Sequence, residues 1–212
     1  MTEYVCPNCR ASTEFVGPRK ACARCGAAER TRAIAHFYPP LREITRSCKG
    51  LVISPEGWLQ SEWFESLEVS VYGGQNHLDV QAIERRPGSY DWVVLNHVLE
   101  HVEDDQAAVR ELRRILAADG VLQLSVPEPF NKLDTEDWGF ADAAKFGHFR
   151  EYGSDITLKL RQNFHGHAIA VEAADTLTPH RDWIFCLSPG YERLRSVGQA
   201  SRRAGRAVLR LF

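Results

Sequence analysis

The sequence predicts an α/β fold, a doubly wound and mainly parallel sheet, preceded by a small metal-binding ribbon. Residues 92–95 form a short apolar run, and polar residues, a helical pattern over residues 104–116 and a second apolar run over residues 121–126 follow it. This order is a βαβ unit, which joins two parallel strands. Nearer the N-terminus, two CxxC pairs are separated by twelve residues, a spacing typical of a zinc ribbon.

Composition limits the class of protein. The chain has 212 residues, 44% of them hydrophobic and 25% charged, which suits one globular α/β domain with a small appendage. The net charge of −2 gives the whole chain no bias toward nucleic acid. No apolar run is long enough for a membrane span, and the N-terminus lacks a signal-peptide core, so we expect a cytoplasmic protein. Nothing in the sequence indicates an oligomeric state.

Four segments are expected: a zinc ribbon at residues 1–27, a connector helix and linker at 28–49, the α/β domain at 50–190, and a basic amphipathic helix at 191–212. The last segment places apolar residues on one helical face and arginines around them. Such a helix can bind a membrane surface or an acidic partner, but it more often packs on its own domain.

The two CxxC pairs supply four soft ligands, which zinc binds in a tetrahedron. A glycine at position 26 allows the chain to turn tightly after the second pair. Because all four ligands are cysteines, no coordination position stays open, and the metal is expected to stabilise a ribbon too small to fold alone. A redox pair or a disulfide is the less favoured alternative. The predicted ligands are Cys6, Cys9, Cys22 and Cys25.

The remaining elements follow from apolar patterns and from Pro, Gly and Ser signals. A connector helix should end at the prolines 39–40. Helical patterns also cover residues 58–67 and 154–164. Further strands are expected at 50–54, 68–72, 168–173 and 183–187, the last two as an antiparallel pair at the sheet edge.

Polar side chains cluster directly after the strand at residues 92–95, where open α/β sheets place their ligands. They are Asn96, His97, Glu100 and His101. If this segment is helical, the two histidines lie four residues apart on one face beside the glutamate, a group that can bind a divalent metal. Alternatively, the polar groups fix the loop beneath a cofactor without any metal.

Three stretches resemble class I S-adenosylmethionine (SAM)-dependent methyltransferases of the type 11-like group, in members that carry a zinc ribbon. They are YDWVVLNHVLEHVEDD and its continuation to residue 129, the turn SPE at residues 54–56, and GHFREYG at residues 147–153. The resemblance implies a Rossmann-like, seven-stranded fold and SAM as the cofactor. The βαβ pattern alone would also suit an unrelated doubly wound protein.

The resemblance also implies site residues. The turn after the first strand would contact the methionine end of SAM, Asp79 the adenine, and Asn96 and His97 the floor of the site. The implied cofactor residues are Ser54, Pro55, Glu56, Gly57, Gly74, Gln75, Asp79, Val80, Asn96 and His97. At residue 79, a turn aspartate is the alternative. The usual glycine-rich loop is missing, and Gln75 or Asn76 stands where a carboxylate usually binds the ribose.

His148 is the candidate general base or orienting group, because a histidine titrates near neutral pH. A histidine satisfied within the fold is the alternative. Arg150 and Tyr152 would help to hold the acceptor. The implied catalytic residues are His148, His97, Arg150 and Tyr152.

The predicted function is SAM-dependent methyl transfer to an oxygen or nitrogen of a small-molecule or glycan-type acceptor. The alternative is a non-catalytic module of the same fold, which uses the zinc ribbon and basic tail for protein or nucleic-acid contacts. The degenerate cofactor loop favours the alternative, and the clustered titratable groups favour the enzyme. An RNA substrate is a third candidate, but the ribbon has few aromatic residues for base contacts, so nucleic acid is the less favoured partner.

Overall fold

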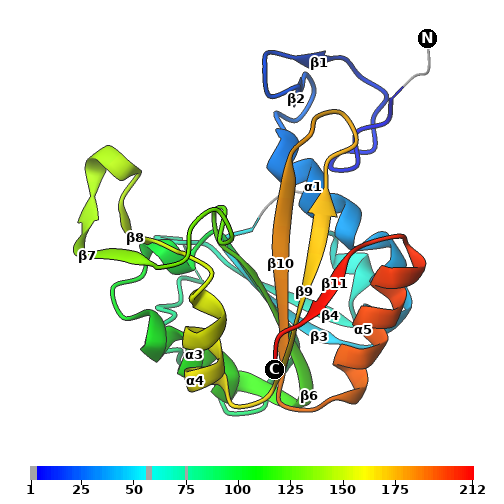
Figure 1. Ribbon diagram of the computed structural model, residues 1–212. Helices are drawn as coiled ribbons and strands as arrows, with labels where there is room; N and C mark the ends of the chain where they lie inside the picture. The colour runs from blue at the N-terminus through cyan, green and yellow to red at the C-terminus, as the bar shows by residue number, and fades with distance from the viewer. Residues whose placement is uncertain (1–3, 56–58, 75) are drawn as a thin grey trace.

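The computed structural model describes residues 4–55, 59–74 and 76–212. A ribbon at the N-terminal end, a central sheet with helices on both faces, and a projecting hairpin make up the chain (Figure 1). The central sheet has seven strands, in the order β11 (Val208–Arg210), β9 (His167–Ala174), β10 (Arg181–Ser188), β6 (Leu116–Ser125), β5 (Tyr90–Asn96), β3 (Lys49–Ile53) and β4 (Ser66–Ser70).

The strand directions confirm the predicted mixed, mainly parallel sheet. The strands β4, β3, β5 and β6 pair in parallel, β10 is antiparallel to β6, and β9 is antiparallel to β10. The strand β9 therefore runs in the same direction as the first four. At the centre, Val93 pairs with Leu51 on one side and with Leu122 on the other. Both faces of β5 are buried, as a continuous apolar run requires.

Helices cover both faces of the sheet (Figure 1). One face packs against α3 (Asp105–Ile115) and α4 (Ile156–Phe164), and the other against α1 (Glu29–Phe37), α2 (Arg42–Thr45) and α5 (Glu192–Arg203). The Asp104 carboxylate accepts a hydrogen bond from the Ala107 amide at 2.8 Å, so it caps α3 and complements the positive helix end. Short 3-10 turns complete the fold: η1 (Pro39–Leu41), η2 (Ser61–Trp63), η3 (Leu99–His101) and η4 (Ala143–Lys145).

Two small antiparallel pairs lie outside the central sheet. The ribbon contains β1 (Phe15–Val16) and β2 (Ala21–Cys22), and it sits at the tip of the long β9–β10 arm (Figure 1). The second pair is the projecting hairpin of β7 (Glu136–Asp142) and β8 (His148–Glu151). Residues 128–147, which the sequence predicts to be an insertion over the site, therefore build most of this hairpin.

A buried ion pair attaches the ribbon to the arm. The Arg32 guanidinium donates to both carboxylate oxygens of Asp175, at 2.9 and 2.7 Å, and also to the Ala27 carbonyl at 2.9 Å. Both side chains of the pair are fully buried. Asp175 also accepts from the amide and hydroxyl of Thr178. The contact therefore satisfies both charges and fixes the ribbon to the turn between β9 and β10.

The helix predicted over residues 58–67 is wrong. The described part of this segment has only η2, and β4 begins at Ser66. Trp63 and Phe64 are buried against Tyr38, whose ring stacks on the Trp63 indole at 5.7 Å between centroids. The apolar residues thus reach the core from a short turn, and no further helical turn is needed to bury them.

The C-terminal segment is helical only in part. The helix α5 ends at Arg203, and Gly205 with φ +75° turns the chain back. Residues 208–210 then form β11, which pairs with β9. The strand satisfies the backbone groups that the outer side of β9 would otherwise expose. Consequently β9, which the sequence placed at the edge, is an inner strand. None of the helices in the described ranges combines the length and apolar character that crossing a membrane requires.

Candidate functional site

A pocket of about 690 Å³ lies at the carboxyl ends of β3, β4 and β5. Its walls include Ile53, Ser70 and His97, one from the end of each strand. The projecting hairpin contributes residues 141, 147 and 149 to the same pocket. Ligands of open α/β sheets bind at this edge, where successive connections diverge. The volume is within the range of roughly 300–1,000 Å³ that small-molecule sites have.

Four of the predicted cofactor residues line this pocket: Ser54, Asp79, Val80 and His97. Ser54 adopts φ +59° and His97 adopts φ +51°, a conformation that non-glycine residues rarely adopt. Such backbone strain is characteristic of ligand sites. Val80 is buried, whereas the exposed Asp79 accepts hydrogen bonds at Oδ1 from the amide and the side chain of Gln81.

The other predicted cofactor residues do not meet there. Pro55 and Gly74 are exposed, and neither is among the described residues that line the pocket. Asn96 is buried below the pocket, where its side-chain oxygen accepts hydrogen bonds from Gln123 at 3.3 Å and Ser125 at 3.2 Å. The predicted contacts of Glu56, Gly57 and Gln75 lie outside the described residues.

Among the pocket residues that the sequence analysis missed are two with aromatic rings. Tyr72 and His77 follow β4, and their rings meet edge to face at 5.1 Å between centroids. Both side chains are exposed toward solvent. The aromatic residue immediately before the turn of residues 73–74 was the available signal, but an exposed tyrosine near a glycine turn is not specific for a ligand site.

His97 is held between two carboxylates. Its Nε2 lies 3.0 Å from the Asp182 carboxylate, and its Nδ1 lies 3.6 Å from Glu100 Oε1. Burial lowers the pKa of His97, but the contacts with Asp182 and Glu100 outweigh it and raise the pKa to about 9. The ring is therefore protonated at neutral pH, which makes His97 unsuited to act as a base.

His148 lies at the boundary between the first pocket and a second one. The second pocket measures about 470 Å³ and is lined by His148 and by residues 127–132 and 144–152 in part. The His148 ring meets His101, which lines the first pocket, edge to face at 4.6 Å between centroids. Burial lowers the pKa of His148 below its usual value. A neutral imidazole at this boundary can accept a proton or coordinate a metal.

Arg150 and Tyr152 border the second pocket, but their polar atoms bond within the fold. The Arg150 Nε donates to Asp137 at 2.6 Å, and its other nitrogens donate to the carbonyl oxygens of Val102 and, at 2.7 Å, Glu103. The Tyr152 hydroxyl donates to Asp105 at 2.8 Å. Both side chains are almost fully buried. These contacts attach β8 to the segment after β5, so the two residues shape the pocket rather than present free polar groups to a ligand.

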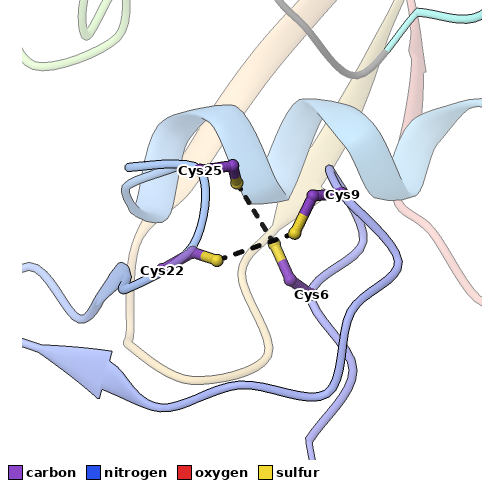
Figure 2. Close-up of side chains that lie close together, drawn as sticks. All are labelled: Cys6, Cys9, Cys22 and Cys25. Carbon is purple, nitrogen blue, oxygen red and sulfur yellow. Dashed lines mark hydrogen bonds between the residues drawn. The ribbon is translucent and has the colours of Figure 1, made fainter.

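The four ribbon cysteines point toward one another (Figure 2). The Sγ atoms of Cys6 and Cys25 are 3.9 Å apart, and those of Cys9 and Cys22 are 3.7 Å apart. A tetrahedron with Zn–S bonds of about 2.3 Å has sulfur–sulfur edges of about 3.8 Å. The two CxxC segments have the same backbone turn. Residues 10 and 26 adopt positive φ, and their amides donate to the carbonyl oxygens of Cys6 and Cys22. The donor set fits a structural zinc ion.

Comparisons with known proteins agree with this geometry. Residues 37–164, more than half of the chain, match the family model described as a methyltransferase domain. The chain belongs to this methyltransferase family. Its fold is that of the class I SAM-dependent methyltransferases. The sequence matches none of the curated proteins with which it was compared.

Among solved structures, the fold is similar to a SAM-dependent methyltransferase of Thermotoga maritima, described as a possible histamine N-methyltransferase. The TM-score is 0.50 at 12% identity, over 76% of this chain and 88% of that chain. It is also similar to a 1,6-didemethyltoxoflavin N1-methyltransferase of Burkholderia thailandensis, solved with bound 1,6-didemethyltoxoflavin and S-adenosylhomocysteine. The TM-score is 0.48 at 14% identity, over 71% of this chain and 76% of that chain.

Proposed function

We propose that the protein is an enzyme that transfers a methyl group from SAM to an oxygen or nitrogen of a small-molecule or glycan-type acceptor. The observation that carries the proposal is the meeting of two pockets at the His101–His148 contact, one of them at the strand ends where this fold binds its cofactor. The two pockets supply separate places for donor and acceptor, with titratable groups at their boundary.

The residues that line the first pocket suit the chemical groups of SAM. Apolar walls at Ile53, Leu78 and Val80 can enclose an adenine ring, and the Asp79 carboxylate can accept a hydrogen bond from an exocyclic amino group. Ser54 and Ser70 offer hydroxyl groups at the ends of β3 and β4. When bound, SAM supplies a methyl group on a positively charged sulfur.

The second pocket would take the acceptor. Charged side chains line it: Lys132 and Lys145 both form ion pairs with Glu151, at 3.3 and 2.9 Å. A polar acceptor can exchange hydrogen bonds with such a wall. His148 would orient the acceptor atom or remove its proton, while Arg150 and Tyr152 would hold β8 in place. The enzyme's main task would be alignment, since the methyl donor is already reactive.

We also propose that the ribbon binds zinc and that the protein is cytoplasmic. The four thiolates would hold zinc as a structural ion, because four protein ligands fill its tetrahedron. Reduced cysteines of this kind suit the cytoplasm, which is where we place the protein. Acidic and basic side chains both line the acceptor pocket, so a small polar molecule suits it better than the uniformly negative backbone of a nucleic acid.

Formation of S-adenosylhomocysteine from SAM, measured over a panel of hydroxyl- and amine-bearing acceptors, tests the proposal. With an active acceptor, His148→Ala should lower turnover by roughly 10²–10⁴-fold. Its affinity for SAM should stay within about twofold of the wild-type value, because His148 lines the second pocket and not the first. His165→Asn is the control, since His165 lines neither pocket and asparagine tolerates its positive φ. Unchanged turnover in His148→Ala would remove this residue from the mechanism.

A further inference from the structure

Three side chains with metal-binding atoms converge where the two pockets meet. Glu100 and His101 belong to η3, whereas His148 is the first residue of β8 on the projecting hairpin. One ligand atom from each lies within 4.8 Å of the other two. Two ligand bonds of about 2.1 Å span at most about 4.2 Å, so the three ligand atoms are close to the separation at which they could share one ion.

The buried carboxylate of Glu100 gives a second, independent indication. Glu100 is only 1% exposed, yet no described residue donates a hydrogen bond to its Oε2 atom. Its Oε1 atom faces His97 at 3.6 Å. A buried carboxylate oxygen without a partner is unfavourable, and native proteins rarely keep one without an ion, a water or a ligand to satisfy it. A cation between Glu100 and the two histidines removes this deficit.

We propose that Glu100, His101 and His148 form a binding site for a divalent transition-metal ion at the boundary between the two pockets. Two imidazoles and one carboxylate favour ions such as Mn²⁺, Fe²⁺, Co²⁺ or Zn²⁺ over Mg²⁺ and Ca²⁺, which prefer oxygen ligands alone. Three protein ligands leave coordination positions open to an incoming molecule. The site therefore differs in kind from the closed set of four cysteines in the ribbon.

This ligand set replaces one member of the set that the sequence suggested. His97 lies behind Glu100, and its Nε2 atom is already bound to the buried Asp182 at 3.0 Å. Its Nδ1 atom faces Glu100 rather than the gap between the pockets. His97 is therefore a positioning residue that holds the Glu100 carboxylate, while the third ligand comes from β8, about fifty residues further along the chain.

The location of the site narrows the class of acceptor, a step that rests on the proposed function. Open positions on an ion beside the second pocket suit an acceptor that offers one or two oxygen atoms, such as a phenol, a vicinal diol or a hydroxy acid. His148 would then orient the acceptor through the metal rather than take up its proton. The ion would also join η3 to the hairpin that borders both pockets.

Binding of Mn²⁺ to the zinc-loaded full-length protein, followed by the electron paramagnetic resonance signal of free Mn²⁺, tests the site. Mn²⁺ is a poor competitor for four thiolates, so the ribbon should not contribute. We expect one Mn²⁺ per chain. Glu100→Gln and His101→Gln should each weaken binding at least about tenfold, since loss of even an outer partner of a metal ligand has an effect of that size. His77→Gln, a change at another exposed histidine of the same pocket, should leave Mn²⁺ affinity unchanged.

The absence of Mn²⁺ binding, or equal affinity in the wild type and both ligand variants, would overturn the site. His101 is exposed, so His101→Gln should fold even if Glu100→Gln does not. Titration of the same samples with SAM separates this proposal from the proposed function. SAM binding without Mn²⁺ binding overturns the metal site alone, whereas site-dependent Mn²⁺ binding without SAM binding supports the site and contradicts methyl transfer.

Discussion

Arg32 and Asp175 form the ion pair on which the junction between ribbon and sheet depends. Both side chains are fully buried, and each charge is satisfied by two hydrogen bonds to the other and by further bonds to neighbouring groups. A buried ion pair of this kind adds little to the free energy of unfolding compared with a well-packed apolar pair, because both charges lose their hydration on folding. Removing one partner is a different case, since it leaves the other charge buried and alone.

Arg32→Ala should therefore lower the free energy of unfolding by about 3–5 kcal/mol. Arg30→Ala is the matched control on the same helix, where an exposed side chain should change it by less than about 0.5 kcal/mol. Urea denaturation of both variants measures the difference. Equal stability of Arg32→Ala and the wild type would show that the ribbon junction does not contribute to folding.

The same pair makes stability depend on pH. Burial raises the pKa of Asp175, but the hydrogen bonds from Arg32 and Thr178 outweigh it and hold the pKa below its usual value. The folded state therefore binds this proton less readily than the unfolded chain. The stabilisation is complete above the ordinary pKa of an aspartate, about 3.9, and is lost as the pH falls through the lower native value. Denaturation curves between about pH 5 and pH 2 should show this loss in the wild type and a smaller loss in Asp175→Asn.

For single residues, the sequence predicts sites that follow from local spacing but not contacts between residues far apart in the chain. The four ribbon cysteines were predicted from their spacing, and their Sγ atoms meet. Arg32 resembles any arginine on an exposed helix face, and the residue that buries it lies 143 positions away. His97 and Asp182 are likewise 85 positions apart. Neither pair leaves a pattern in the chain that a single sequence could reveal.

At the scale of elements, the ribbon has only a small core, so we expect its folding to depend on a bound metal ion. Its buried apolar cluster contains Cys6, Cys22 and Ala27, with Phe15 packed against them. Two strands of two residues each add few hydrogen bonds. Coordination of an ion by four thiolates would supply the missing stabilisation.

Purified protein should hold one tightly bound zinc, and Cys9→Ser should lose it and unfold at a lower temperature. Amide hydrogen exchange should also become faster in the β9–β10 turn, because residues 175–178 contact the ribbon through Arg32. Cys48→Ser should retain the metal, since Cys48 lies outside the ribbon and a hydroxyl can replace its hydrogen bond to the Ile44 carbonyl. Zinc analysis that finds no metal in folded wild-type protein would contradict the ribbon assignment.

Helices and strands were predicted correctly where the apolar pattern of the sequence matches the buried face of the element. The strands β3, β5, β6, β9 and β10 contain apolar runs that match their buried positions. The β7–β8 hairpin was missed because its strands are mostly exposed or only half buried, so no apolar alternation marks them. The strand β11 was missed because its three residues continue the apolar spacing of α5 past the turn at residue 205.

At the scale of the whole molecule, the site is assembled from segments that the sheet brings together. The ends of β3, β4 and β5 form the floor of the first pocket, and the hairpin closes it from the other side. The strand order that places these ends side by side follows from the fold class, so the position of the pocket was predictable. The sequence also predicted an insertion over the site at residues 128–147, but not how it is held there, because that depends on the contact between Arg150 and the carbonyls that follow η3.

The central claim is that the first pocket binds SAM although the usual glycine-rich loop and ribose carboxylate are missing. Calorimetric titration of the full-length protein with SAM and with S-adenosylhomocysteine measures this directly. We predict one site per chain with micromolar affinity for both, weakened by Asp79→Ala and unchanged in Asp142→Ala, a change outside the pocket lining. The absence of heat with either ligand would contradict the claim and would favour a non-catalytic module built on a methyltransferase fold.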